Sequence, residues 1–172
     1  MLPALILPNG RITTSLGFGC ASLLRLPDSF DRQRILDCAI DNGIRHLDVA
    51  RLYGLGLAEA ELNPLLRRHP GALTVATKFG LGEASVPTAK AQRQGSLRRL
   101  LRLFPSMRPL ARRFYRSRFI SHNFSSAHCC QSLHTSLGEL GLDTVDLFLL
   151  HEPSPTDVIP TDLEDTLQEL QR

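Results

Sequence analysis

The sequence predicts an α/β protein in which a parallel sheet with covering helices follows an N-terminal β-hairpin. Apolar runs typical of strands alternate with amphipathic helical segments four times, the pattern of βα units that build a parallel sheet. The last apolar run, Val145 to Leu150, is almost unbroken, as in a parallel strand covered on both faces. Near the N-terminus, Pro8-Asn9-Gly10 has the turn residues of a tight hairpin.

The elements follow one another in a regular order. The hairpin pairs residues 4–7 with 12–14, and a short strand at 16–20 then runs into a glycine-containing loop. Ser29 is placed to cap the first helix, which Gly43 ends. The later elements are a strand at 44–49, a helix at 59–68, a strand at 73–77, a helix that Ser125 or Ser126 caps and Gly141 ends, the strand at 145–150, and a helix at 161–172.

The 172 residues are 42% hydrophobic and 22% charged, an ordinary composition for a globular protein. It excludes collagen-like, low-complexity and wholly disordered chains, and one domain is the expectation at this length. No apolar run approaches the roughly 20 residues of a membrane span. Residues 1–7 lack the basic start of a signal peptide, and the hairpin turn follows at once. We therefore expect a cytoplasmic protein without a transmembrane segment.

The four cysteines and six histidines show no metal-binding pattern. No Cys-x-x-Cys pair occurs, and the adjacent Cys129 and Cys130 could bridge each other only with strain. His128 and His134 flank that pair, but their spacing matches no zinc site. We expect reduced thiols packed as small hydrophobic side chains, and no metal.

Charge is unevenly distributed along the chain. Residues 84–138 contain no Asp or Glu but ten Lys and Arg, so this segment carries +10 while the rest of the chain carries −7. Within it, two runs of apolar residues at helical spacing, at 97–104 and 107–114, predict two basic amphipathic helices. We interpret residues 82–118 as a basic insertion that forms a lid; the alternative is binding to an anionic partner or membrane surface. Since no recognition motif accompanies the charge, no nucleic acid is expected.

Polar residues stand at or near the ends of three successive predicted strands. Asp48 lies at the end of one strand with Tyr53 in the loop after it, Lys78 follows the next, and His151 follows the last. In a (β/α) barrel the carboxyl ends of the strands share one rim, so these side chains would meet there. Taken singly, each has an ordinary structural explanation, as a cap, an ion-pair partner, a surface aromatic or a loop residue; their joint placement favours a site.

These four residue types support the reduction of a carbonyl group. A tyrosine phenol, with a pKa of about 10, is a poor proton donor near neutrality. A lysine beside it would lower that pKa, and Asp48 would keep Lys78 charged and oriented. His151 could donate a hydrogen bond to a carbonyl oxygen. Because the carbonyl carbon would need a hydride, the arrangement implies a nicotinamide cofactor.

The segments that carry these residues resemble the aldo-keto reductase superfamily. The similarity covers nearly the whole chain apart from the basic insertion, and the spacing of the Asp, Tyr, Lys and His is highly specific for that family. The segments are Leu16-Gly17-Phe18-Gly19, Asp48-Val49-Ala50-Arg51-Leu52-Tyr53-Gly54, Thr77-Lys78, Ser136-Leu137-Gly138-Glu139-Leu140-Gly141-Leu142-Asp143-Thr144-Val145-Asp146-Leu147 and Leu150-His151.

The resemblance implies a fold, a reaction and a role for each residue. Tyr53 would be the general acid, Lys78 and Asp48 its tuning pair, and His151 the residue that orients the carbonyl; Asp48 would also lie near the nicotinamide. The family uses NADPH to reduce aldehydes and ketones on an eight-stranded barrel, so the implied substrate is a small carbonyl compound.

The sequence departs from the family in two ways. The usual Asp-Thr-Ala reads Asp48-Val49-Ala50, a mild change. The fold usually needs about 250 residues, and only four βα units are present here, so residues 1–172 are predicted to form the N-terminal part of a (β/α)8 TIM barrel. The half that supplies most cofactor contacts in the family has no counterpart. The alternatives to a working reductase are a truncated, inactive fragment, which would associate through its exposed edges, and an anion-binding or membrane-surface protein.

Overall fold

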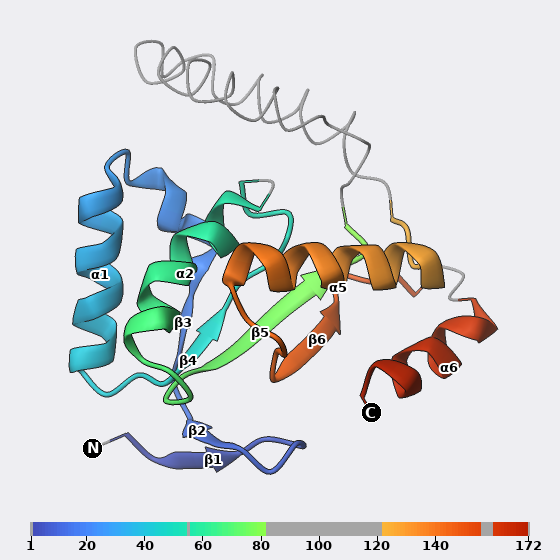
Figure 1. The fold of residues 1–172 in the computed structure, drawn as a ribbon, viewed down its shortest axis with the longest axis horizontal. Coiled ribbons are helices and arrows are strands. Elements are labelled where there is room, and N and C mark those ends of the chain that lie inside the picture. Colours follow the sequence, from blue (N-terminus) through green and yellow to red (C-terminus); the bar gives the residue numbers. More distant parts are fainter. Residues whose placement is uncertain (1, 55, 82–121, 156–159, 172) are drawn as a thin grey trace.

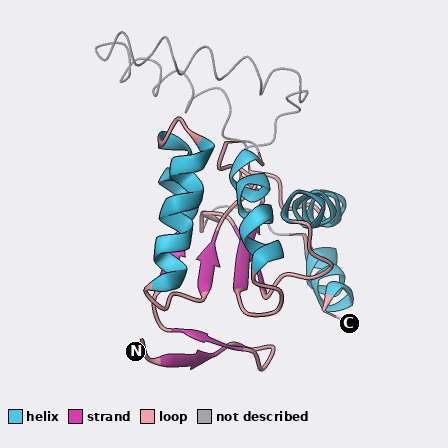
Figure 2. Ribbon diagram, turned by 60° about the vertical axis from the view of Figure 1, so that its left-hand side comes forward, coloured by secondary structure: helices cyan, strands magenta, loops and turns pink. Residues whose placement is uncertain are grey.

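The computed structural model describes residues 2–54, 56–81, 122–155 and 160–171, and it has the expected α/β architecture. A four-stranded sheet has the order β3-β4-β5-β6, and all its neighbouring strands are parallel. The helices cover one face of this sheet (Figures 1 and 2). The strands are β3 (Gly17–Gly19), β4 (His46–Asp48), β5 (Thr74–Phe79) and β6 (Leu147–Leu150), and the helices are the 3-10 helix η1 (Cys20–Arg25), α1 (Ser29–Asp41), α2 (Leu57–Arg68), α5 (Ser126–Leu140) and α6 (Thr161–Leu170).

The predicted hairpin is confirmed, and it closes the end of the sheet at which the strands begin (Figure 1). Strands β1 (Ala4–Ile6) and β2 (Ile12–Thr14) pair antiparallel, and the turn between them contains Gly10 in the left-handed region. The Thr13 hydroxyl lies 2.6 Å from that of Thr74 at the start of β5, and Arg11 forms an ion pair with Asp146 at 2.9 Å. The hairpin is therefore tied to two strands of the sheet.

Helix ends follow the sequence signals with one correction. Ser125 caps α5 by accepting a hydrogen bond from the backbone of His128, and Gly141 ends that helix in the left-handed conformation, as predicted. The cap of α1 is Asp28 and not Ser29: the Asp28 carboxylate accepts from the Phe30 N–H at 2.8 Å. The Ser29 hydroxyl instead donates to Glu61 of α2, because Ser29 already lies inside the first helical turn.

Two hydrophobic clusters hold the helices against the sheet. The larger cluster lies between η1, α1, α2 and the strands, and it includes Leu36, Leu47 and Leu62, each fully buried. The smaller cluster contains Phe79, which stacks on Phe148 with ring centroids 4.8 Å apart. Because strand side chains alternate, the outward residues of β4 to β6 fill these clusters and the inward residues point to the opposite face.

The prediction that the last strand is covered on both faces is wrong for the part of the chain that the structure describes. Strand β6 lies at one edge of the sheet, and Leu149 is 41% exposed. Phe148 and Leu150 pack outward against the smaller cluster, while Leu149 points to the inner face, which no described element covers.

Two other expectations concern the cysteines and the basic insertion. The four cysteines are free, but only Cys20 and Cys129 are buried, whereas Cys38 and Cys130 are exposed, so the expectation of packed thiols holds for half of them. Residues 82–121 lie outside the described residues, so the two basic helices and the insertion at 82–118 stay predictions. Among the described helices, none has the length and apolar character needed to cross a membrane.

Candidate active site

The parallel register of the sheet brings all four predicted residues to one edge. Strand β4 ends at Asp48, Lys78 is the penultimate residue of β5, and His151 directly follows β6. The His151 N–H donates to the carbonyl of Phe79 at 2.8 Å, which continues the pairing of the two strands by one residue. Parallel strands expose their carboxyl ends on the same side, and in barrel enzymes that side carries the active site.

Lys78 and Asp48 form the ion pair that the sequence predicts. The ammonium of Lys78 donates to an Asp48 carboxylate oxygen and also to the backbone carbonyl of Val49 at 2.9 Å. The Lys78 side chain is only 14% exposed, whereas that of Asp48 is 45% exposed. The lysine is therefore held from two directions, and the aspartate still presents part of its surface to the open inner face.

Tyr53 faces both Lys78 and His151 from the loop between β4 and α2. The Lys78 ammonium lies 5.6 Å from the centroid of the phenol ring, within the range of a cation–π contact. The rings of Tyr53 and His151 meet edge to face, with centroids 5.7 Å apart and an interplanar angle of 87°. Backbone bonds from the Tyr53 N–H to the Ala50 carbonyl, and from the Ala58 N–H to the Tyr53 carbonyl, fix the loop.

The predicted lowering of the tyrosine pKa is wrong for this arrangement. The pKa of Tyr53 is raised, mainly because burial disfavours the phenolate and further because the charge of Asp48 lies nearby. Lys78 contacts the ring face and gives its hydrogen bonds to Asp48 and Val49, so its charge is largely compensated. Tyr53 therefore keeps its proton at neutral pH.

His151 is a buried, neutral imidazole. Only 5% of the residue is exposed, and its pKa is lowered, first by burial and second by the positive charge of Lys78. The carboxylates of Glu152 and Asp48 act in the opposite direction but do not outweigh these effects. A neutral histidine has one ring N–H to donate and one ring nitrogen to accept, which suits it to hold a polar ligand.

The structure adds two residues to this edge that we did not predict. Cys20 follows β3, and burial raises the pKa of its thiol to about 12, with a further contribution from Asp48. Glu152 follows His151 and has a φ of 49°, which is unusual for a residue other than glycine. The rule that identified the other residues, position at a strand end, could have found both.

The described residues beside Asp48 leave open space on the inner face of the sheet. Gly19 pairs with Asp48 across β3 and β4, and a Cβ atom at Gly19 would meet no atom within 4 Å. A flat ring therefore has room beside the exposed part of Asp48. These residues fit the reacting end of a nicotinamide cofactor, and the described residues include no cluster able to hold a metal ion.

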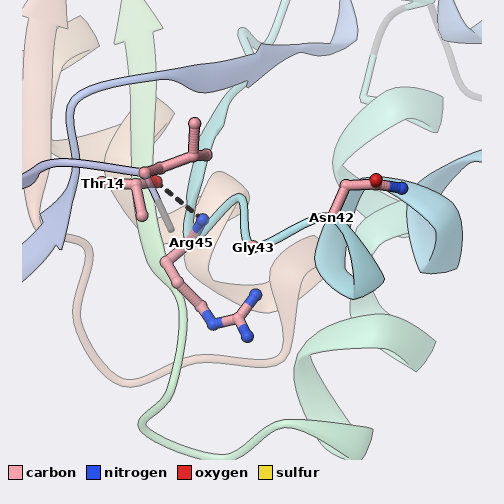
Figure 3. Close-up of a pocket in the computed structure, with 5 residues that line it drawn as sticks. Thr14, Asn42, Gly43 and Arg45 are labelled. Carbon is pink, nitrogen blue, oxygen red and sulfur yellow. Dashed lines mark hydrogen bonds between the residues drawn. The ribbon is translucent and has the colours of Figure 1, made fainter.

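An open cavity of about 380 Å³ lies at the opposite end of the sheet and is separate from this site (Figure 3). It is lined by Leu2, Thr14, Asn42, Gly43 and Arg45. The Thr14 hydroxyl accepts a hydrogen bond from the Arg45 N–H at 2.9 Å, and the guanidinium donates to the carbonyls of Ile40 and Ile44. Arg45 thus ties the end of α1 to the hairpin, in keeping with the stabilising role of this end of the sheet in barrel enzymes.

Comparisons with known proteins place this fold and site in one family. Residues 15–172 match the aldo/keto reductase family, and the chain belongs to it. It is 30% identical over 159 residues to a D-threo-aldose 1-dehydrogenase from a Pseudomonas species, covering 87% of this chain and 43% of that protein. It is 39% identical over 75 residues to a pyridoxal 4-dehydrogenase from Microbacterium luteolum, covering 42% of this chain and 22% of that protein. The chain thus spans less than half the length of these relatives.

Solved structures show the same fold. An aldo-keto reductase from Bacillus halodurans in its holo form has a TM-score of 0.72 at 24% identity, covering 99% of this chain and 47% of that one. An aldo-keto reductase from Klebsiella pneumoniae in complex with NADPH has a TM-score of 0.63 at 15% identity, covering 99% of this chain and 45% of that one. The α/β prediction is confirmed as part of an aldo-keto reductase barrel.

His151 is expected to titrate below the ordinary histidine pKa of about 6.5. In NMR spectra of the labelled chain, its ring should stay neutral at a pH at which exposed histidines are half protonated, because burial and Lys78 both oppose protonation. Lys78→Met removes the second of these causes and should move the titration midpoint of His151 upward. An NMR midpoint at or above 6.5 for His151 in the parent chain would contradict the lowered pKa.

The lowered pKa of His151 also makes the stability of the parent chain depend on pH. Near pH 6 the folded parent chain binds fewer protons than the unfolded chain, so its free energy of unfolding should fall as the pH drops through this range.

Proposed function

We propose that this chain carries the proton-donating site of an NADPH-dependent reductase that acts on aldehydes or ketones, with Tyr53 as the general acid. The observation that carries the proposal is the convergence of Tyr53, Lys78, Asp48 and His151 at the carboxyl edge of the sheet. All three of these contacts join residues from different βα units, so the convergence is a product of the fold and not of local sequence. Membership of the aldo/keto reductase family supports the same reaction class.

His151, Tyr53 and Lys78 would each have a separate role at the carbonyl oxygen of the substrate. The neutral His151 would donate a hydrogen bond to that oxygen and hold it near the phenol, whose ring it contacts. As negative charge develops on the oxygen, Tyr53 would donate its proton while the Lys78 ammonium lies over the face of the phenol ring. A raised pKa of Tyr53 is compatible with this step, because an alkoxide is a stronger base than a phenolate and therefore takes the proton from the phenol.

NADPH would supply the hydride when bound, and Asp48 and Gly19 would lie beside its nicotinamide. The room beside Gly19, the partial exposure of Asp48 and the NADPH named for the Klebsiella pneumoniae structure support this assignment. The names of the curated relatives, an aldose dehydrogenase and a pyridoxal dehydrogenase, support a small polar carbonyl compound as substrate.

Tyr53→Phe tests the role of the general acid. It removes one hydroxyl and preserves the ring contacts with His151 and Lys78, so the fold should be unchanged while NADPH-dependent carbonyl reduction falls by about a hundredfold or more. NADPH oxidation at 340 nm on a panel of aldehydes measures the effect. Tyr115→Phe, the same substitution at the other tyrosine, is the matched control and should keep the parent rate. Equal turnover by Tyr53→Phe and the parent would exclude Tyr53 as the acid.

The two edges of the sheet support a second proposal, self-association of the 172-residue chain. Strands β3 and β6 each have one side without a strand partner among the described residues, and Leu149 on the inner face is 41% exposed. A parallel sheet has two complementary edges, so β6 of one copy is able to pair with β3 of another. Unpaired edges with apolar neighbours commonly associate.

Light scattering after size exclusion tests this association. The chain should elute as a species heavier than its 19.1 kDa monomer. Leu149→Lys should shift it toward the monomer, because a charge on the inner face beside the edge opposes pairing. Leu170→Lys is the matched control, since Leu170 is equally exposed on α6, and it should leave the mass unchanged. A monomeric parent at all accessible concentrations would end this proposal.

A further inference from the structure

We infer that Glu59 is a positioning residue that couples the loop of Tyr53 to the strand of Lys78. This inference rests on the proposed function, because it concerns the two residues to which that function assigns the proton transfer. Glu59 lies in the first turn of α2 and is fully buried, with 0% exposed. A buried carboxyl group is costly unless it is paired and hydrogen-bonded, so its partners indicate what it does.

The two oxygens of Glu59 contact two different elements. Oε2 forms an ion pair with the guanidinium of Arg51, at 3.2 Å. Oε1 accepts a hydrogen bond from the Thr77 hydroxyl at 2.8 Å, and Thr77 is itself fully buried. Arg51 precedes Tyr53 by two residues, and Thr77 immediately precedes Lys78. One side chain therefore bridges the segments that carry the proposed acid and its lysine.

The Arg51 end of the bridge shapes the loop of Tyr53. The loop closes on itself through a hydrogen bond from the Gly56 N–H to the Arg51 carbonyl at 2.9 Å. The Arg51 guanidinium packs directly over Gly56, where a Cβ atom would lie only 2.1 Å from it and where φ is +88°. Only glycine suits this position on both counts. Tyr53 thus lies in a loop whose Gly56 packs against a guanidinium that Glu59 holds in place.

The Thr77 end of the bridge fixes the direction of Lys78. Successive side chains of a strand point to opposite faces, so Thr77 faces the helices while Lys78 faces the inner side of the sheet. The hydrogen bond from Thr77 to Glu59 ties the outward face of β5 to α2. The backbone between Thr77 and Lys78 then sets where the Lys78 ammonium lies. Glu59 contacts neither Tyr53 nor Lys78 directly, so it affects them through its partners Arg51 and Thr77.

Glu139 provides a built-in comparison for the charge of Glu59. Its carboxylate, on α5, lies 3.9 Å from the same guanidinium, but its side chain is 39% exposed. No hydrogen bond from Glu139 to Thr77 is present in the described structure. If only negative charge near Arg51 matters, substituting Glu59 or Glu139 should change the surroundings of Tyr53 equally. If the bridge matters, only the substitution of Glu59 should change them.

Tyrosine fluorescence offers a readout that needs neither cofactor nor turnover. The sequence contains no Trp and two Tyr, so a Tyr115→Phe background leaves Tyr53 as the single tyrosine. Acrylamide quenching then measures the access of solvent to Tyr53 in the folded chain at neutral pH, well below the thermal transition. A residue with a merely structural role would change the melting temperature but not this native-state quenching.

In this background, Glu59→Gln should raise the quenching constant about twofold, because the ion pair between Arg51 and Glu59 is lost and the loop opens. Glu59→Asp keeps the charge but is too short to reach both partners, so it should have the same effect. Thr77→Val removes the hydrogen bond from Thr77 to Glu59 and should also raise the quenching constant. Thr77→Ser keeps the hydroxyl and should have the quenching constant of the parent. Glu139→Gln should leave quenching unchanged.

Two results would overturn the inference. One is a parent-like quenching constant in folded Glu59→Gln and Thr77→Val, which would mean that the bridge does not hold Tyr53. The other is an equal increase in Glu139→Gln and Glu59→Gln, which would assign the effect to charge alone. Should Glu59→Gln fail to fold, Thr77→Val against Thr77→Ser decides the question. Absence of reductase activity would reject the proposed function without changing any of these measurements.

Discussion

The hydrogen-bond register across β5 determines both how the core packs and which side chains meet at the site. This strand pairs with β4 on one side and β6 on the other, and its six residues are the longest strand of the sheet. The register sets Asp48 beside Ala76 and Lys78 beside Leu149, and the His151 N–H continues it beyond β6. A shift by one residue would turn Lys78 toward the helices and Thr77 toward the inner face, so the site and the core depend on the same pairing.

The electrostatics of the site follow first from burial and then from the charges of Asp48 and Lys78. Burial raises the pKa of Tyr53, with a further contribution from Asp48, and burial followed by the charge of Lys78 lowers the pKa of His151. A phenol that stays protonated and an imidazole that stays neutral are the states that the proposed reduction would need.

Sequence patterns predicted the fold and the site where the signal was local or periodic. Strand ends located Asp48, Lys78 and His151, and the cap chemistry of Ser125 and Gly141 located the ends of α5, because these depend on neighbours in the chain. The sequence did not reveal the bridging role of Glu59, since the contact with Thr77 joins a helix to a strand and leaves no periodic pattern.

Sequence patterns also could not predict the exposure of β6 or the direction in which the pKa of Tyr53 is shifted. An apolar run predicts a strand that prefers burial on both faces, but what covers each face is decided by the neighbouring elements. The pKa of Tyr53 is raised by burial and by the charge of Asp48, and residue types alone show neither how deeply the phenol is buried nor that Lys78 contacts its ring face. Side-chain geometry across elements is the common cause of both differences.

The fold of this chain brings Tyr53 and His151 into ring contact. The most direct measurement is the nuclear Overhauser effect between their ring protons, in a chain labelled at Tyr and His and carrying Tyr115→Phe to remove the other tyrosine. An edge-to-face contact with centroids 5.7 Å apart predicts cross-peaks between the two rings. A well-folded spectrum that contains both rings but no cross-peak between them would contradict the account.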